Sequence, residues 1–112
     1  MLTRAGARLF STEALVVVNN VAKQQFTITL ANDNAVLRYK EKGKNIVFEH
    51  TDVPPVFQGK GVGRLLAKYA FDHAYKNQLD VTCQCHFLAK YFKENQNNYK
   101  GLNITFNLEE NE

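Results

Sequence analysis

The first half of the chain alternates between apolar and polar side chains, the pattern of β-strands with one buried face. It is clearest in residues 25–30, where Phe26, Ile28 and Leu30 would share one face and two threonines the other. The same pattern predicts strands at residues 14–19, 35–40 and 46–53. Because only short polar turns separate these segments, the first four strands are expected to pair in antiparallel fashion.

The period of the pattern changes after Pro54 and Pro55, which cannot donate backbone hydrogen bonds to a ladder and so end the fourth strand. Apolar side chains then recur at helical spacing. The segments predicted in the second half are a helix at 61–77, a strand at 79–85, a helix at 87–95 and a short strand at 101–107. A strand, helix and strand of this length form a right-handed parallel crossover, so the fourth and fifth strands are expected to be parallel neighbours.

These elements predict an α/β (α+β) fold with a mixed sheet of five to six strands and two main helices. The chain of 112 residues has room for one domain of ordinary size, which we place at residues 14–112. Its formal charge of +3 comes from scattered residues without a block of five like charges, which is weak support for nucleic-acid binding. No apolar run is long enough to span a bilayer, so neither a nucleic acid nor a membrane is expected as a partner.

Two cysteines, Cys83 and Cys85, are separated by one residue and would point to the same face of a strand, with geometry unsuited to a mutual disulfide. A zinc site would need further ligands, and the nearest candidates are His86 and the more distant His73 and His50. We therefore expect no metal.

Residues 1–13 differ in character from the rest of the chain. They carry Arg4, Arg8 and several hydroxyl side chains, with no acidic residue before Glu13. This composition is similar to that of a mitochondrial presequence, and a short flexible tail is the alternative. The protein is expected to be intracellular, either mitochondrial or cytoplasmic.

The segment between the fourth strand and the first helix carries the main candidate for ligand binding. It consists of Gln58, Gly59, Lys60, Gly61, Val62, Gly63 and Arg64. Glycines at alternate positions clear the side from which a ligand would approach, and they permit backbone angles that direct successive N–H groups into one concavity. The helix that follows adds unpaired N–H groups and the positive end of its dipole, so a pyrophosphate is the expected ligand.

Two other phosphate-binding motifs do not fit this segment. A Walker A loop would need Gly-Lys-Ser or Gly-Lys-Thr after the turn, and neither occurs here. The dinucleotide fingerprint would need a small residue where Arg64 stands, and it would follow a parallel rather than an antiparallel strand. A glycine-rich turn without a ligand remains the alternative.

The spacing Gln58-x-x-Gly61-x-Gly63 resembles the Q/R-x-x-G-x-G/A signature of the GNAT superfamily of N-acetyltransferases. The resemblance extends to His50-Thr51-Asp52-Val53-Pro54 before the motif and to Cys85-x-Phe87 after it, and it covers roughly residues 15–99. Together these segments look like a subfamily of small stand-alone acetyltransferase domains. His86 departs from the subfamily pattern, which usually has proline there.

The resemblance implies a minimal GNAT fold, in which the fourth and fifth strands splay apart. It implies that residues 58–64 bind the pyrophosphate of acetyl-CoA and that Val53 lines the pantetheine arm. An amine, either of a small molecule or of a lysine, would then attack the thioester directly, with no metal. The expected partners are thus acetyl-CoA and an amine acceptor, and the protein is expected to be a monomer or a weak dimer.

Catalytic candidates lie near the expected wedge between the two strands. His50, which would share a face with Ile46 and Phe48, could accept the amine's proton, or it could simply fix the strand end by a hydrogen bond. Cys85 could act as a thiol acid or a transient acyl acceptor, although a small buried cysteine is the commoner role.

Two further features bear on catalysis. Many larger relatives protonate the departing thiolate with a tyrosine on the second helix, and by resemblance Tyr91 is the nearest candidate, unless Phe92 occupies that place. The long helices that shape the acceptor site in larger relatives are missing, since only residues 19–24 separate the first two strands. A non-catalytic acyl-CoA-binding or sensing module is therefore the alternative function.

Overall fold

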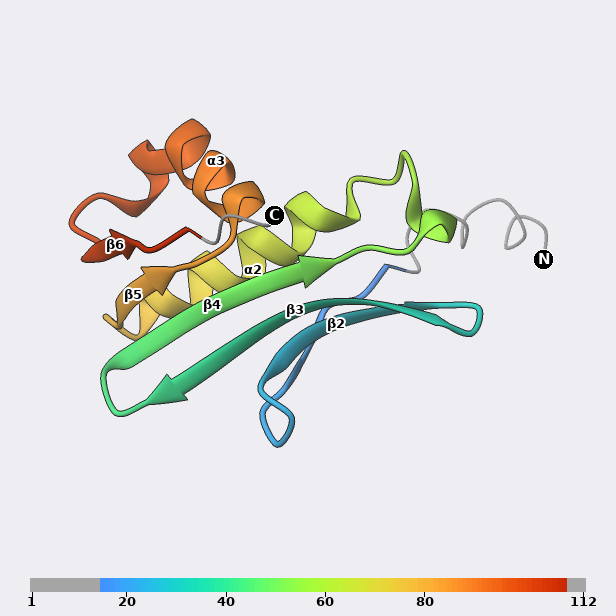
Figure 1. Ribbon diagram of the computed structural model, residues 1–112, viewed down its shortest axis with the longest axis horizontal. Helices are drawn as coiled ribbons and strands as arrows, with labels where there is room; N and C mark the ends of the chain where they lie inside the picture. The colour runs from blue at the N-terminus through green and yellow to red at the C-terminus, as the bar shows by residue number, and fades with distance from the viewer. Residues whose placement is uncertain (1–14, 109–112) are drawn as a thin grey trace, which may run out of the picture.

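The computed structural model describes residues 15–108, which form one six-stranded sheet and two main helices (Figure 1). The strands are β1 (Val18–Asn20), β2 (Gln25–Leu30), β3 (Asp33–Lys42), β4 (Asn45–Asp52), β5 (Asp80–Cys83) and β6 (Ile104–Phe106). The helices are α2 (Val62–Lys76) and α3 (His86–Asn95), accompanied by the short 3-10 helices η1 (Pro55–Phe57) and η2 (Gln96–Tyr99).

The sheet is mixed, with the strands in sequence order from β1 to β6. The first four strands pair in antiparallel fashion, whereas β4 with β5 and β5 with β6 are parallel. Two-residue turns join β2 to β3 and β3 to β4, and Gly43 in the second turn has a φ of +60°, which favours glycine. The predicted mixed sheet, with parallel fourth and fifth strands, is confirmed.

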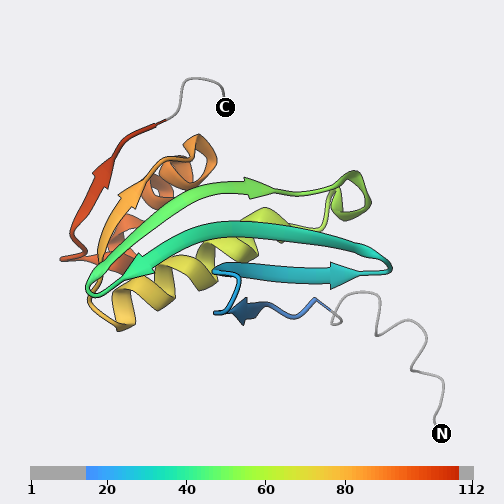
Figure 2. The ribbon, with the colours of Figure 1, turned by 60° about the horizontal axis from the view of Figure 1, so that its bottom comes forward.

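Both helices lie on the same face of the sheet. The two crossovers, β4–α2–β5 and β5–α3–β6, advance along the sheet in the same direction, and right-handed crossovers of this kind place their helices on one side. Figure 2 shows the sheet in front with α2 and α3 behind it. No helix in residues 15–108 covers the opposite face, which we call the open face.

The core lies between the sheet and the helices, and Phe71 of α2 is at its centre. The Phe71 ring is fully buried and makes an edge contact with Phe48 of β4 at a centroid distance of 5.1 Å. It also packs against Tyr91 and Phe92 of α3 and Tyr99 of η2. One aromatic side chain thus joins the sheet to both helices.

A β-bulge in β4 reverses the alternation of its side chains. Arg38 of β3 pairs with His50 and the next residue, Tyr39, pairs with Phe48, so Glu49 is an extra residue on β4. Phe48 faces the core, whereas His50 lies opposite exposed Arg38 on the open face. The expectation that His50 shares a face with Phe48 is therefore wrong, because strict alternation does not anticipate a bulge.

The fourth and fifth strands separate halfway along β4. The parallel pairing runs from Asn45 with Asp80 to Phe48 with Cys83, and one further hydrogen bond joins the Gln84 N–H to the Phe48 carbonyl at 2.9 Å. Beyond this point β4 continues to Asp52, while the chain after Cys83 turns away into α3. The predicted splay is present.

Element boundaries differ from the predicted ones mainly at the strands. The first strand begins only at Val18, because this is where pairing with β2 starts, and the fifth is shorter than predicted because Cys85 caps α3. The 3-10 helices η1 and η2 are additional elements. No helix within residues 15–108 is long and apolar enough to cross a membrane. The N-terminal tail or presequence lies outside the described residues.

Replacing Phe71 with alanine should lower the free energy of unfolding by about 3–5 kcal/mol, because the substitution opens a cavity between the sheet and both helices. Urea denaturation followed by circular dichroism measures this change. Tyr69→Ala, at an exposed position on the same helix, is the control and should cost less than about 1 kcal/mol. Equal losses for the two variants would contradict the central position of Phe71.

Candidate functional site

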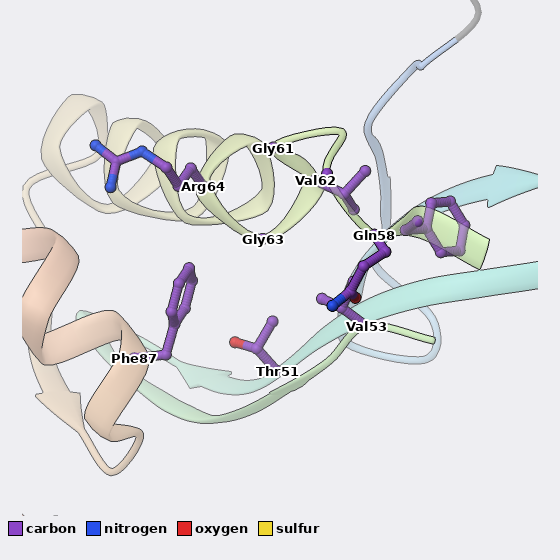
Figure 3. A pocket seen from close by; sticks show the side chains of 10 residues that line it. Thr51, Val53, Gln58, Gly61, Val62, Gly63, Arg64 and Phe87 are labelled. Atoms are coloured by element: carbon purple, nitrogen blue, oxygen red, sulfur yellow. The ribbon is translucent and has the colours of Figure 1, made fainter. Parts of the chain in front are cut away.

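A pocket of about 490 Å³ lies where the end of β4, the start of α2 and the first turn of α3 meet (Figure 3). Two of its walls come from segments far apart in the sequence. Thr51 and Val53 face Gly63 across the pocket in Figure 3, and Phe87 stands at the α3 side. The lining residues are Thr51, Val53, Phe57, Gln58, Gly59, Gly61, Val62, Gly63, Arg64 and Phe87.

The loop that enters α2 is held by its own backbone. The prolines start η1, in which the Phe57 N–H donates to the Pro54 carbonyl at 3.0 Å and the Gln58 N–H to the Pro55 carbonyl at 2.9 Å. The Lys60 N–H then donates to the Phe57 carbonyl at 3.2 Å. The buried Phe57 ring anchors this turn, so the glycines that follow have a defined position.

Two of these glycines have left-handed backbone angles. Gly59 has a φ of +74° and Gly61 a φ of +68°, a region that other residues enter at a cost of about 1–2 kcal/mol. A Cβ added to either residue would meet no atom within 4 Å. Glycine is thus required here by backbone geometry, and the space in front of the loop is open to a ligand.

The backbone N–H groups at the start of α2 are available to a ligand. Gly61 is the N-cap, and the first backbone hydrogen bond runs from the Leu65 N–H to the Gly61 carbonyl at 3.1 Å. Among residues 15–108, no backbone carbonyl accepts from the N–H groups of residues 61–64. We call this group the amide cradle; it lies at the positive end of a 15-residue helix and suits an anion.

Gly63 is required for a different reason. A Cβ at this position would lie 3.0 Å from the tip of the Phe87 ring, tighter than a normal contact. The absence of a side chain lets Phe87 of α3 pack directly on the first turn of α2. This contact closes the pocket on its α3 side.

Thr51 and Cys85 come together where β4 leaves β5. Thr51 pairs with buried Leu37, so its side chain faces the helices, and its Oγ1 lies 3.8 Å from the Cys85 Sγ. Either atom can be the donor. Cys85 is only 3% exposed and does not line the pocket, so Thr51 lies between the thiol and the pocket.

A family model and several known proteins are similar to this chain. The GCN5-related N-acetyl-transferase family matches residues 25–102 of this chain. Protein NATD1 of Gallus gallus is 41% identical to this chain over 76 residues, which cover 65% of this chain and 69% of that protein. Protein NATD1 of Homo sapiens is also 41% identical over 76 residues, which cover 65% of this chain and 67% of that protein. The chain belongs to the GCN5-related N-acetyltransferase family.

A solved structure supports the same assignment. The solution NMR structure of a GCN5-like proposed N-acetyltransferase from Staphylococcus aureus superposes with a TM-score of 0.59 and 27% sequence identity, over 88% of this chain and 93% of that one. Enzymes of the GCN5-related family use acetyl-CoA, so membership supports an acetyl-CoA-dependent acetyltransferase in general.

The structure gathers most of the predicted cofactor-binding residues around one pocket. Val53 and six residues of the loop line it, whereas Lys60 does not. The structure adds three lining residues that we had not assigned to the site, Thr51, Phe57 and Phe87. Thr51 and Phe87 lie within the segments that carry the family resemblance, so the resemblance could have pointed to both residues.

The two predicted catalytic residues lie on different sides of β4. Cys85 is buried behind Thr51, and His50 is exposed on the open face. Neither lines the pocket. Within residues 15–108, no group of three or more His, Cys, Asp or Glu side chains could hold a metal ion, and neither cysteine forms a disulfide.

A second groove, of about 690 Å³, adjoins the pocket at Gly61 and Arg64 and runs between α2 and the α3–η2 segment. Arg64 forms an ion pair with Glu94 at 3.1 Å and lies over the Tyr91 ring. Tyr91 lines this groove rather than the pocket, and Phe92 packs against Phe71. Tyr91, the tyrosine that by resemblance would protonate the thiolate, therefore does not line the pocket.

Tyr99 is the most strongly perturbed titratable group near this groove. Burial raises its pKa well above the ordinary value of 10.0, and hydrogen bonds to Tyr91 and Asp72 act in the same direction. Its hydroxyl donates to the Asp72 Oδ1 at 2.9 Å, and Lys68 binds the other oxygen of that carboxylate at 2.8 Å. The hydrogen bond to Asp72 in turn raises the pKa of Lys68.

A Tyr99→Phe variant should show how this burial affects stability at high pH. The unfolded tyrosine ionises near pH 10 and the folded one only above it, so stability is lost as pH rises past about 10. Without the hydroxyl, the loss with pH should be smaller by up to about 1.4 kcal/mol per pH unit. Urea unfolding at a series of alkaline pH values measures this slope. A Tyr99→Phe slope equal to that of the parent would contradict the assignment, and Tyr69→Phe is the matched control.

Proposed function

We propose that this protein transfers an acetyl group from acetyl-CoA to an amine, of a small molecule or a lysine, by direct attack on the thioester. The observation that carries the proposal is the amide cradle opening onto an apolar pocket beside the free end of β4. A cradle of main-chain donors suits the pyrophosphate, and an apolar channel suits the pantetheine arm.

The end of β4 adds a second complementary feature. Residues 49–52 have no β5 partner, so their backbone groups on that side are available for hydrogen bonds. The pantetheine arm carries two amide groups, which can pair with such a strand edge in the manner of a short additional strand. Val53 and Phe57 supply apolar contacts on the way from the amide cradle to this edge.

Proton transfer has to be supplied from outside the lining of the pocket. None of the ten lining residues is a histidine, lysine or carboxylate, although an amine acceptor must lose a proton before it attacks. His50, next to Thr51 on the opposite face of β4, is our proposed base for an amine that approaches from the open face. Cys85 is the proposed acid behind Thr51.

The absence of an acid or base from the pocket lining also favours a second candidate function. A protein that binds acyl-CoA without turning it over would need the cradle and the apolar pocket but no proton-transfer group. Such a carrier or sensor should bind acetyl-CoA as the enzyme would. Turnover therefore separates the two functions, and binding does not.

Gly61→Ala should weaken binding of acetyl-CoA by about tenfold or more, measured by isothermal titration calorimetry. The substitution strains a left-handed backbone at the first residue of the amide cradle, and a shift of these N–H groups would lengthen their charge-assisted hydrogen bonds to the ligand. Gly43→Ala is the matched control, because its φ of +60° imposes similar strain at the remote β3–β4 turn. If both variants lose affinity equally, or if neither variant loses affinity, the coenzyme binds elsewhere.

His50→Ala and Cys85→Ala should each reduce acetyl transfer to pooled amines by about a hundredfold, the usual contribution of a positioned acid or base. Labelled acetyl-CoA and mass spectrometry of the products measure the rate. His86→Ala serves as the control, since this exposed residue at the start of α3 does not line the pocket. Parent rates in both variants would overturn the two assignments, and no transfer by the parent protein would favour the carrier.

A further inference from the structure

Thr51 is the only hydroxyl-bearing side chain among the ten residues that line the pocket. The other polar side chains there belong to Gln58 and Arg64, on the loop and on the first turn of α2. Figure 3 places Thr51 on the β4 wall, between Val53 and Phe87 and across from Gly63. This hydroxyl therefore lies away from the amide cradle, at the part of the pocket where β4 and β5 separate.

Position along the pocket decides which part of the substrate Thr51 would meet. If the pyrophosphate binds at the amide cradle, the pantetheine arm must extend along the pocket toward the splay, and the thioester is at its far end. The sulfur then lies near the Thr51 hydroxyl. A group in this place can donate a hydrogen bond to the sulfur as negative charge develops on it.

Cys85 is too deeply buried to contact a substrate in the pocket directly. Its side chain is 3% exposed and absent from the pocket lining, whereas its Sγ lies 3.8 Å from the Thr51 Oγ1. The thiol therefore has a route to the pocket through the threonine hydroxyl. A hydroxyl can accept one hydrogen bond while it donates another, so it can pass a proton between two sulfur atoms.

We propose that Thr51 is a catalytic residue that relays a proton from Cys85 to the departing sulfur, an inference that rests on the proposed acetyl transfer. The amine nitrogen forms its bond to the carbonyl carbon as the carbon–sulfur bond breaks. Thr51 gives its hydroxyl proton to the sulfur and takes the Cys85 thiol proton in the same step. Of the two protons that the ammonium nitrogen loses, His50 takes one and passes it to solvent, and the other restores Cys85.

The backbone places Cys85 at the N-terminus of a helix. Cys85 is the N-cap of the ten-residue helix α3, whose first backbone bond runs from the Ala89 N–H to the Cys85 carbonyl. The positive end of the helix dipole stabilises negative charge at this position.

The test measures the acidity of the CoA thiol bound to the protein, by its ultraviolet thiolate absorbance across a pH series after subtraction of the CoA-free protein. The bound thiol should be about tenfold more acidic than in free CoA, because Thr51 donates a hydrogen bond to the thiolate. Thr51→Val should abolish the difference and Thr51→Ser should restore it. Thr82→Val, on the open face of β5, is the control and should behave as the parent.

Kinetics with acetyl-CoA and pooled amines give the second readout. Thr51→Val should lower kcat by about a hundredfold, at least as much as Cys85→Ala, while KM for acetyl-CoA changes little, since Cys85 acts through this hydroxyl. The Thr51→Val, Cys85→Ala double variant should be no slower than the slower single variant, because both belong to one relay. Additive losses would overturn the relay.

The outcomes separate this inference from the proposed function. If calorimetry shows that the parent binds neither CoA nor acetyl-CoA, the proposed function itself fails. If the parent binds CoA but the bound thiol is as acidic as free CoA, or Thr51→Val leaves its acidity unchanged, the relay alone is overturned.

Discussion

The rest of the structure depends on the point at which β5 stops pairing with β4. Pairing ends at Phe48 and Cys83, yet β4 continues to Asp52. Backbone groups left without a ladder partner need another hydrogen-bond acceptor or donor, so this stretch can bind a substrate in place of a strand. The turn of the chain into α3 brings Phe87 against Gly63 and closes the wall opposite. Because β5 ends before β4 does, the sheet opens beside β4 and the pocket forms next to this opening.

The bulge at Glu49 determines which side chains face that opening. With an extra residue in β4, Thr51 faces the core side and His50 the open face. Without the bulge, regular alternation from Phe48 would place His50 beside the pocket and Thr51 outside it. The Thr51–Cys85 contact exists only in the bulged register. The chemistry available at the pocket therefore depends on one inserted residue in the strand, as is common for bulges near functional sites.

Sequence reasoning reached the elements whose physical cause is local. Alternation predicted β2, helical spacing predicted α2, and the glycine spacing predicted a loop whose Gly59 and Gly61 need left-handed angles. It did not reach Thr51 or Phe87, because their importance comes from contacts between segments more than twenty residues apart. The bulge that moves His50 depends on the pairing of β3 with β4, which the residues of β4 alone do not specify.

The position of the two helices on one face has a consequence for how an acceptor reaches the thioester. The proposed coenzyme site lies on the helix side, where the amide cradle, Phe87 and the inner face of β4 form the pocket. Helices and the aromatic packing around Phe71 fill that side, whereas no described helix covers the other. The splay between β4 and β5 is the place where the two faces communicate. In the proposed reaction an amine would approach most easily from the open face, where His50 lies, while Thr51 and Cys85 would act on the departing sulfur from the helix side. One strand would then separate the base from the acid, because neighbouring residues of a strand point in opposite directions.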